Sequence, residues 1–251
     1  MDKKWIFFLS VKKITTKIVF DGRFAPEHSD LIVMKPNFVI AAAFALSILL
    51  LSACKSTTVE VPASMALRNG AVNDPSAVTV KVSLGNRAVY VIENGETKFA
   101  AAIAIGTASN PTPVGNFKVQ SKEAKKRSSG YGFFVKGDQV IPGKRSNMPS
   151  GYRYVGYPLP YWVYFSHDCG FHGGAVWPEP RTHGCLRLHK TIAADFYNMV
   201  KVGTPVLVAN SQPEDATVGR NIPRPTDFDH PDSPPSVLIT DAPFTRTDVY
   251  Y

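Results

Sequence analysis

The sequence predicts a mainly β domain with one or two helices, and three observations lead to this fold class. Apolar and polar residues alternate with a period of two from Val78 to Leu84, which is typical of a half-buried strand. The pair Asn94-Gly95 follows a second apolar segment and is a strong signal for a hairpin turn. One segment, residues 191–203, repeats its apolar residues with the period of a helix.

Further strands are expected along the chain, so that the domain opens as a β meander. Residues 87–92 predict the second strand, and residues 97–105 predict a third that is apolar enough to be buried on both faces. Shorter β-prone segments follow at residues 117–120, 161–166 and 204–209. The strands outnumber the helices, which favours a mainly β class.

The predicted helix has both a start and a stop signal. Thr191 can cap its N-terminus, and Gly203 lies just past its end. Between them, apolar residues fall on one helical face at Ile192, Phe196, Met199 and Val200. We expect this face to pack into the core.

Three segments lack a strand or helix pattern. Residues 106–116 are rich in Gly, Pro, Thr and Ser, which indicates a loop. Residues 121–160 predict a long polar loop with a basic run at 122–127, and a loop of this length usually serves function, here as a lid over a cleft. Residues 211–251 are acidic and Pro-rich with few apolar residues, so we expect a mostly disordered tail.

The positive charge of the chain is concentrated in its middle. The formal net charge is +8, and residues 54–210 carry 18 Lys and Arg against nine Asp and Glu. A basic surface favours anionic partners such as an acidic cell-wall polymer. No Lys/Arg-rich helix or aromatic stacking platform of the nucleic-acid type is evident in the sequence, so we do not expect nucleic acid as a partner.

A targeting signal is predicted near the start of the chain. Met34 is followed by one Lys and by an apolar run at residues 38–53 that ends in small residues, which is typical of a secretory signal peptide. The run is shorter than the ~20 residues of a comfortable membrane span. Its last residues, Leu-Ser-Ala-Cys at 51–54, resemble the bacterial lipobox, which makes Cys54 the expected lipid attachment point. The alternative is an uncleaved membrane anchor.

The segments around this signal complete the expected organisation. Residues 1–33 precede a complete signal, so we interpret them as a mis-annotated extension and Met34 as the true start. Residues 54–76 are polar and irregular, which is typical of a tether. Lys55 follows the lipidated cysteine, and by analogy with Gram-negative sorting this favours the outer membrane. The expected location is periplasmic and lipid-anchored.

The densest group of reactive residues lies between positions 166 and 189. Its members are His167, Asp168, Cys169, His172, His183, Cys185 and His189. One interpretation is cysteine catalysis, in which a neighbouring base or cation activates the thiol. A second is a zinc site, although these spacings match no common zinc module. The third is a set of buried core histidines and thiols.

Cysteine catalysis requires a base and a group that stabilises negative charge. His172 and His183 are the two candidate bases for Cys185. The glycines after His172 allow close approach of the backbone to other groups. The backbone N–H groups of Gly184 and Cys185 could form an oxyanion hole beside the nucleophile.

Three motifs together resemble a known family. Pro-Thr-Pro-Val-Gly-Asn-Phe at residues 111–117, Phe-His-Gly-Gly at 171–174 and Thr-His-Gly-Cys-Leu-Arg-Leu at 182–188 are similar to those of the L,D-transpeptidase catalytic domain, the YkuD family. The resemblance covers residues 77–209. It implies a mostly β, sandwich-like domain with a catalytic cleft, and it implies no metal or organic cofactor.

The resemblance also implies catalytic roles. Cys185 would be the nucleophile, and His172 would be the base that generates the thiolate and later the acid for the leaving group. The backbone carbonyl of Gly173 would orient His172. His183 and Gly184 would shape the nucleophile loop and the oxyanion hole.

Further residues near these motifs are assigned to substrate or to the loop. Arg187 would hold the nucleophile loop or face a substrate carboxylate, and a structural ion pair is the alternative. Thr182 occupies the Ser/Thr position of the motif and is grouped with the substrate-binding residues. Cys169 is an unexpected extra cysteine, interpreted as a buried thiol or as a reversible disulfide partner of Cys185.

Four aromatic residues near the motifs are candidates for a peptide-binding cleft. Tyr157, Tyr161 and Trp162 lie in or next to the β-prone segment before the cluster, and core packing is an equal explanation for Tyr161 and Trp162. Trp177 lies in a Pro-rich loop between the two motifs and is the better candidate for substrate binding.

The expected function is L,D-transpeptidation of peptidoglycan stem peptides through a cysteine thioester, in cell-wall biogenesis and cell shape. The acceptor could be a second stem, the terminal Lys of a wall-tethered lipoprotein, or a free D-amino acid. The alternatives are an L,D-carboxypeptidase or hydrolase and a non-catalytic wall-binding lipoprotein. The expected organisation is: extension 1–33, signal peptide 34–53, tether 54–76, catalytic domain 77–210 and tail 211–251.

Overall fold

The computed structural model describes residues 65–166, 169–177, 179–224 and 231–251. The chain divides into two units, Met1–Val59 and Glu60–Tyr251, and every described residue belongs to the second. The predicted extension, the signal peptide and the lipidated Cys54 therefore lie outside the described residues. Among the residues that are described, no helix combines the length and the apolar character needed to cross a bilayer.

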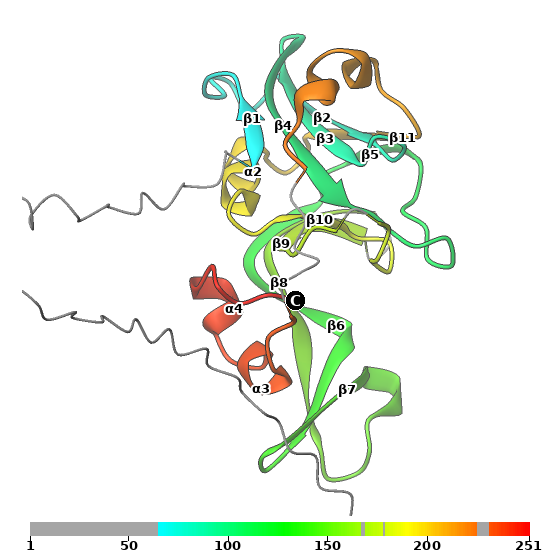
Figure 1. The fold of residues 1–251 in the computed structure, drawn as a ribbon, viewed down its shortest axis with the longest axis vertical. Helices are drawn as coiled ribbons and strands as arrows, with labels where there is room; N and C mark the ends of the chain where they lie inside the picture. The colour runs from blue at the N-terminus through cyan, green and yellow to red at the C-terminus, as the bar shows by residue number, and fades with distance from the viewer. Residues whose placement is uncertain (1–64, 167–168, 178, 225–230) are drawn as a thin grey trace, which may run out of the picture. The chain divides into compact units, whose positions relative to one another are not determined.

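The described unit is built mainly from β-strands, which confirms the predicted class (Figure 1). The strands are β1 (Ala66–Arg68), β2 (Val78–Ser83), β3 (Ala88–Glu93), β4 (Glu96–Ala104), β5 (Gly115–Lys118), β6 (Ser121–Lys136), β7 (Gln139–Lys144), β8 (Arg153–Ser166), β9 (Cys169–Gly174), β10 (Leu186–His189) and β11 (Pro205–Ala209). Their order is β5-β11-β2-β3-β4-β10-β9-β8-β6-β7, and β1 also pairs with β4.

The helices of the described residues are short. They are α2 (Ala193–Met199), α3 (Pro235–Leu238) and α4 (Ala242–Thr245), with 3-10 turns η2 (Arg145–Asn147), η3 (Pro213–Ala216) and η4 (Val218–Asn221). Helix α2 is the helix that the sequence predicts. Its N-cap is Ile192 rather than Thr191, because the Thr191 hydroxyl lies 2.8 Å from the ring nitrogen Nδ1 of His189.

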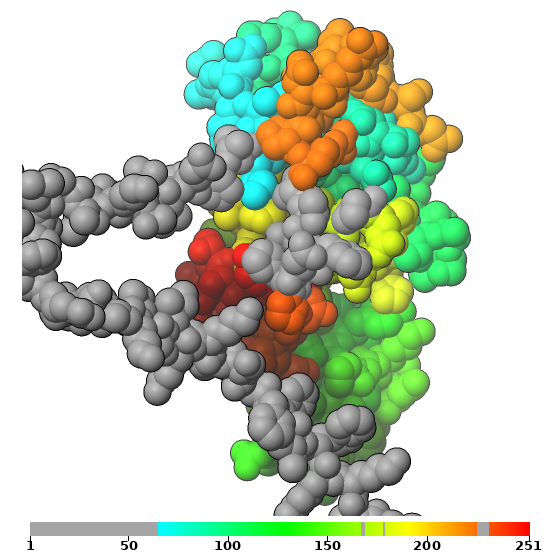
Figure 2. Space-filling view, in the orientation of Figure 1, coloured from blue at the N-terminus to red at the C-terminus, as the bar shows by residue number. Residues whose placement is uncertain are grey.

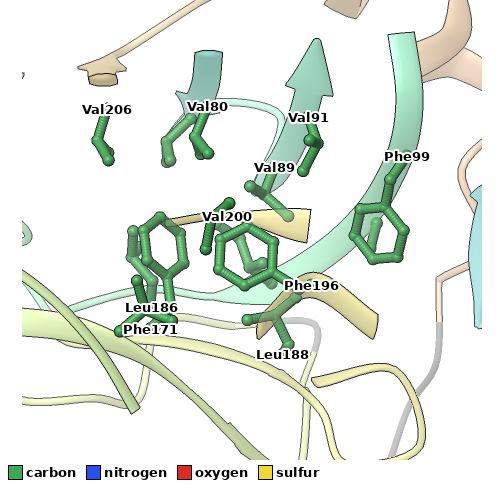
Figure 3. Close-up of a cluster of buried hydrophobic side chains, with 14 of the residues drawn as sticks. Val80, Val89, Val91, Phe99, Phe171, Leu186, Leu188, Phe196, Val200 and Val206 are labelled. Atoms are coloured by element: carbon green, nitrogen blue, oxygen red, sulfur yellow. The ribbon is translucent and has the colours of Figure 1, made fainter. Parts of the chain in front are cut away.

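The main hydrophobic core brings together side chains from two groups of strands. Val80, Val91 and Val206 come from β2, β3 and β11, whereas Phe171 and Leu186 come from β9 and β10, and all five are buried (Figure 3). Helix α2 adds Phe196, whose ring centroid lies 4.7 Å from that of Phe171. The core therefore fixes β9 and β10, the strands that flank the reactive cluster, against the rest of the sheet.

The predicted loop at residues 121–160 is instead largely β-structure. Strand β6 pairs antiparallel with both β7 and β8, and Lys125 lies opposite Pro160 in the second pairing. Much of β6 is exposed, so its sequence lacks the alternation that marks a half-buried strand. Prolines within β7 and β8 weaken the strand signal further.

The predicted tether also requires a correction, because its last part is folded. Residues 66–68 form β1, which pairs antiparallel with β4 and places Ala101 opposite Ala66. Ala66 is buried in the main core. A strand of three residues is too short to show a period of two, so the sequence pattern does not reveal it.

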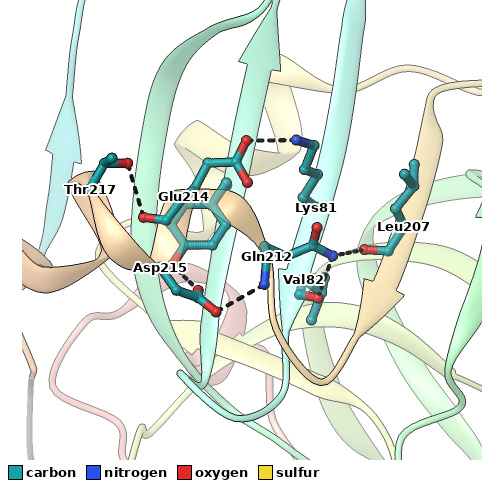
Figure 4. Close-up of polar contacts among 8 residues, drawn as sticks. Lys81, Val82, Leu207, Gln212, Glu214, Asp215 and Thr217 are labelled. Atoms are coloured by element: carbon teal, nitrogen blue, oxygen red, sulfur yellow. Dashed lines mark hydrogen bonds and ion pairs between the residues drawn. The ribbon is translucent and has the colours of Figure 1, made fainter.

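The first half of the predicted disordered tail docks on the sheet through polar contacts (Figure 4). The buried Tyr90 hydroxyl donates to Asp215 at 2.6 Å, and the Ser83 hydroxyl donates to the other oxygen of that carboxylate at 2.7 Å. Lys81 forms an ion pair with Glu214 at 2.6 Å. Acidic residues that suggest disorder in the sequence are thus paired with groups on β2 and β3, and this pairing orders the segment.

The second half of the tail, residues 231–251, packs against β6 and β8 through α3 and α4. Its Leu238, Val249 and Tyr251 are buried in a second cluster together with Phe133 and Val135 of β6. The segment needs few apolar residues of its own to pack in this way, because strands that are distant in the sequence supply the apolar surface that it covers. The tail and the predicted catalytic domain therefore belong to the same compact unit.

Candidate active site

The reactive cluster gathers at the junction of β9 and β10. The two strands are parallel neighbours, with Leu186 opposite Phe171 and Arg187 opposite His172. Cys185 immediately precedes β10, so the pairing brings it beside the start of β9, the strand that carries His172. Both side chains line one cavity of about 1110 Å³.

His172 is held as a buried, neutral base. Its ring nitrogen Nδ1 lies 2.9 Å from the Gly173 carbonyl oxygen, which can only accept, so Nδ1 carries the proton and Nε2 keeps its lone pair. The pKa of His172 is lowered to about 3, chiefly by burial and secondly by the positive charge of Arg187, while the bond to Gly173 raises it and offsets part of this shift. The ring is therefore neutral at physiological pH.

The loop that carries Cys185 is braced by two threonines. The Thr182 hydroxyl donates to the Cys185 carbonyl oxygen at 2.6 Å, and the Thr112 hydroxyl donates to the Gly184 carbonyl oxygen at 2.8 Å. Thr112 belongs to the Pro-Thr-Pro motif, which explains why that distant loop accompanies the cysteine motif. Thr182, which the sequence groups with the substrate-binding residues, borders the cavity but uses its hydroxyl within the loop.

Gly184 requires the conformation that glycine permits. Its φ is +108°, and a Cβ at this position would lie 3.0 Å from the Cys169 sulfur. Its N–H donates to the Thr182 hydroxyl at 3.2 Å. This N–H is engaged within the loop, so in this structure it does not take the oxyanion-hole position that the sequence predicts for it.

His183 has a different environment from His172. It is exposed and stacks on the ring of Tyr131 from β6, with centroids 4.6 Å apart and an interplanar angle of 21°. The Lys144 ammonium group also lies over the Tyr131 ring, 5.3 Å from its centroid. His183 therefore links the nucleophile loop to the β6–β7 hairpin, which agrees with a loop-shaping role better than with that of a base.

Arg187 and Trp177 lie together at the cavity. The Arg187 guanidinium is 4.8 Å from the Trp177 ring centroid, and that of Arg181 is 4.2 Å from the same ring. Arg187 is 8% exposed, and its Nη1 donates to the Tyr251 main-chain oxygen at 3.2 Å. Its buried Nε has no hydrogen-bond partner among the described residues. A buried guanidinium bordering a cavity favours an anionic ligand.

The aromatic candidates are placed in two different environments. Tyr157, Trp162 and Trp177 line the cavity. Tyr161 packs instead with Tyr197 of α2, with ring centroids 5.8 Å apart. Regular alternation along β8 would place residues 157 and 161 on the same face, so the positive φ of 56° at Tyr161 marks a break in the strand that separates their environments.

Cys169 is buried behind the nucleophile loop, against Gly184, and both it and Cys185 are thiols in this structure. Among the described residues, no group of three or more His, Cys, Asp or Glu side chains is arranged to hold a metal ion.

Several residues that line the cavity lie outside the sequence motifs. They come from the β6–β7 hairpin and from residues 231–251, and they include Lys126, Tyr131, Lys144, Asp232 and Tyr251. No local motif marks them, because only the tertiary structure brings these segments to Cys185.

Comparisons with known proteins identify the family of the chain. The family model of the YkuD L,D-transpeptidase catalytic domain matches residues 77–208. A search of curated proteins gave no significant match.

Similar solved structures include an L,D-transpeptidase from Stackebrandtia nassauensis, with 23% identity and a TM-score of 0.41 over 57% of this chain and 60% of that one. Another is an L,D-transpeptidase from Mycobacterium smegmatis, with 19% identity and a TM-score of 0.41 over 53% and 58% of the two chains. The chain thus covers about three fifths of each of these proteins. Because the family model spans more than half of the chain and contains both His172 and Cys185, the protein belongs to the YkuD family of L,D-transpeptidase catalytic domains.

Proposed function

We propose that this protein is a cysteine-dependent L,D-transpeptidase that acts on peptidoglycan stem peptides through a thioester. One observation carries the proposal. The Cys185 thiol borders the same cavity as a neutral His172, whose tautomer leaves Nε2 as a proton acceptor. A thiol and a neutral imidazole with this arrangement form the pair that nucleophilic cysteine catalysis requires.

The first step transfers the acyl group to the enzyme. The Cys185 sulfur attacks the carbonyl of the L-centre residue while its proton moves to His172 Nε2. An ordinary thiol has a pKa of about 8.5, so an imidazole with a pKa of about 3 does not hold this proton before attack. The proton transfer is therefore coupled to the attack. The terminal D-residue then leaves as an amine that takes the proton from His172.

We expect substrate binding to raise the pKa of His172 and so to make it a stronger base. Arg187 lowers the pKa of His172 electrostatically, and a substrate carboxylate at the cavity would compensate its charge. The pKa of His172 would then rise, and the base would become stronger when substrate is present.

The second step releases the thioester to an amine. The acceptor nitrogen attacks the thioester carbonyl, the C–S bond breaks, and the thiol is restored. Candidate acceptors are the diamino acid of a second stem, the terminal Lys of a wall-tethered lipoprotein and a free D-amino acid. A hydrolase with water as acceptor is the second candidate, and the open cavity around Cys185 is the observation that favours it.

The predicted targeting signal supports a proposal for the location of the protein. We propose a periplasmic enzyme anchored by lipid at Cys54 in the outer membrane, with peptidoglycan as its partner and no nucleic acid. Radiolabelled palmitate incorporation, lost in Cys54→Ala, would support the anchor, whereas equal labelling of both proteins would refute it.

Incubation of the purified protein with muropeptides, followed by mass spectrometry, tests the reaction. Cross-linked or exchanged products indicate transpeptidation, shortened stems indicate hydrolysis, and unchanged muropeptides indicate a binding protein. Cys185→Ala should abolish both products and also the acyl adduct on the protein. Product formation by Cys185→Ala would contradict the mechanism.

A further inference from the structure

Residues 231–251, hereafter the C-terminal segment, form one wall of the cavity that contains Cys185. Figure 2 shows this segment, in orange-red and red, against the green surface of β6 and β8. Its cavity-lining residues are Asp232, Ser233, Pro234, Pro235, Leu238 and Tyr251. The segment therefore borders the space in which the chemistry occurs, although it follows the matched family region in the sequence.

The segment is a fixed part of the cavity wall. Arg127 of β6 donates from Nη1 to the Leu238 carbonyl oxygen at 3.0 Å and from Nη2 to that of Thr240. The same guanidinium lies 5.0 Å from the centroid of the Phe244 ring. Together with the burial of Leu238, these contacts hold the segment in place. They favour a permanent wall over a displaceable plug.

The end of the segment reaches the strands that carry the catalytic pair. The Tyr251 main-chain oxygen accepts hydrogen bonds from Arg187 Nη1 and from the Ala175 N–H, both at 3.2 Å. The Tyr251 ring meets the Tyr157 ring edge-on, with centroids 5.7 Å apart. The wall is thus connected to Arg187, two residues after the nucleophile.

The charges around the cavity are unequal. Four lining residues are permanent cations, namely Lys126, Lys144, Arg181 and Arg187. Asp232 has the one acidic side chain among the described lining residues. Asp232 lines the same cavity as Arg181, Arg187 and Tyr157. The pKa of Tyr157 is raised by burial, lowered by Arg187, raised by Asp232 and lowered by Arg181, in agreement with this placement.

We propose that Asp232 is the docking residue for the ammonium group of the acyl acceptor, with Arg187 and Arg181 receiving a carboxylate of that acceptor. The inference rests on the proposed transferase function and defines its acceptor class. That class is a primary amine on an amino acid unit that also bears a carboxylate, supplied by a free D-amino acid or by a diamino acid within a stem. Water needs neither charge.

The transfer step is balanced as follows. Asp232 binds the ammonium form, which loses one proton to solvent at the cavity mouth to become the attacking amine. The amine nitrogen forms a C–N bond to the thioester carbonyl, and the C–S bond breaks. The second proton of the nitrogen passes through His172 to the Cys185 sulfur, which becomes a thiol again.

Steady-state kinetics of Asp232→Asn test the proposal. Asp232 is exposed, so the isosteric amide leaves the core packing intact. We expect the KM for amine acceptors to rise about two- to fivefold, the effect of losing one solvent-exposed ion pair of up to ~1 kcal/mol. Hydrolysis of the acyl donor in the absence of an amine should stay unchanged. Both a D-amino acid and a diamino acid peptide are assayed, to distinguish the two sources.

Two controls separate acceptor docking from general damage. Asp248→Asn removes another exposed carboxylate of the same segment, one that pairs with Arg246 rather than lining the cavity, and should leave the acceptor KM unchanged. Hydroxylamine, a nucleophile that is largely uncharged at neutral pH, should be used equally well by Asp232→Asn and the unmodified protein.

An unchanged acceptor KM in Asp232→Asn, or equal losses with hydroxylamine and with charged amines, overturns the inference while leaving the proposed function intact. Failure of the proposed function is recognised separately, because the unmodified protein would then form no acyl adduct on Cys185, and the inference would fail with it.

Discussion

The ring nitrogen Nδ1 of His172 lies 2.9 Å from the main-chain oxygen of Gly173, the next residue in the chain. This contact fixes the proton on Nδ1 and leaves Nε2 as the acceptor. It needs no third side chain, so the orienting group is part of the backbone of β9. A substitution at position 173 would retain this carbonyl, because it belongs to the main chain.

The pH profile of kcat/KM should show an acid limb far below that of an ordinary histidine. His172 acts as a base only when neutral, and burial together with the charge of Arg187 lowers its pKa to about 3. Activity should therefore persist at pH values well below 6.5. Arg187→Met removes the positive charge and should move the acid limb to higher pH, whereas Arg187→Lys should move it less. An acid limb near 6.5 in the unmodified protein would contradict a buried, depressed His172.

Stability should depend on pH through the same residue. The pKa of His172 is lower in the folded state than its ordinary value of 6.5, so the unfolded chain binds more protons between about 3 and 6.5. Stability should rise with pH across this window, by at most ~1.4 kcal/mol per pH unit, and level off above it. Urea unfolding of the protein and of His172→Asn at several pH values measures the difference, which should shrink as the pH falls.

Gly184→Ala should reduce activity strongly. The new Cβ would lie 3.0 Å from the Cys169 sulfur, and the φ of +108° is unfavourable for alanine, so the loop that carries Cys185 must shift. We expect a cost of about 1–3 kcal/mol and a loss of activity of at least tenfold. Gly203→Ala is the matched control: its φ is +91° but no atom lies within 4 Å, so it should cost stability without changing the activity of the folded protein.

Thr182→Val should lower kcat more than it raises KM. The hydroxyl donates to the Cys185 carbonyl oxygen and accepts from the Gly184 N–H, and valine has a similar shape but provides neither bond. Loss of two buried hydrogen bonds costs about 2–4 kcal/mol, shared between folding and loop geometry. Thr182→Ser retains the hydroxyl and should recover most of the activity. A rise in KM alone would indicate a direct contact with substrate instead.

Tyr90→Phe should destabilise the protein without affecting the cleft. The buried hydroxyl donates to Asp215 at 2.6 Å, and hydrogen bonds to charged groups contribute about 1.5–3 kcal/mol. The urea midpoint should fall, and residues 211–224 should become more sensitive to proteolysis. Asp248→Asn, in an exposed ion pair, should leave the midpoint nearly unchanged. Equal proteolysis of Tyr90→Phe and the unmodified protein would show that this contact does not order the segment.

Much of the fold follows from local patterns in the sequence. The alternation of apolar and polar residues that begins at Val78 and the helical spacing of apolar residues around Phe196 are visible in the sequence. Side chains that face a core recur with the geometry of the strand or helix that carries them. β6, β7 and the first half of β8 were missed, since an exposed strand has no apolar alternation and the prolines of β8 suggest turns, whereas residues 161–166 of β8 were predicted as β-prone. The docking of residues 211–251 was also missed, because it depends on partners such as Tyr90 and Arg127.

The sequence by itself identified the candidate residues for the chemistry. Cys185 and His172 stand in short motifs whose residues are close in the chain, and their identities alone limit the reaction to a thiol and an imidazole. Only the tertiary structure decided the protonation of His172, the engagement of the Gly184 N–H and the entry of Asp232 into the cavity. Each of these depends on burial or on contacts between segments distant in sequence, and neither burial nor such contacts are encoded by local spacing.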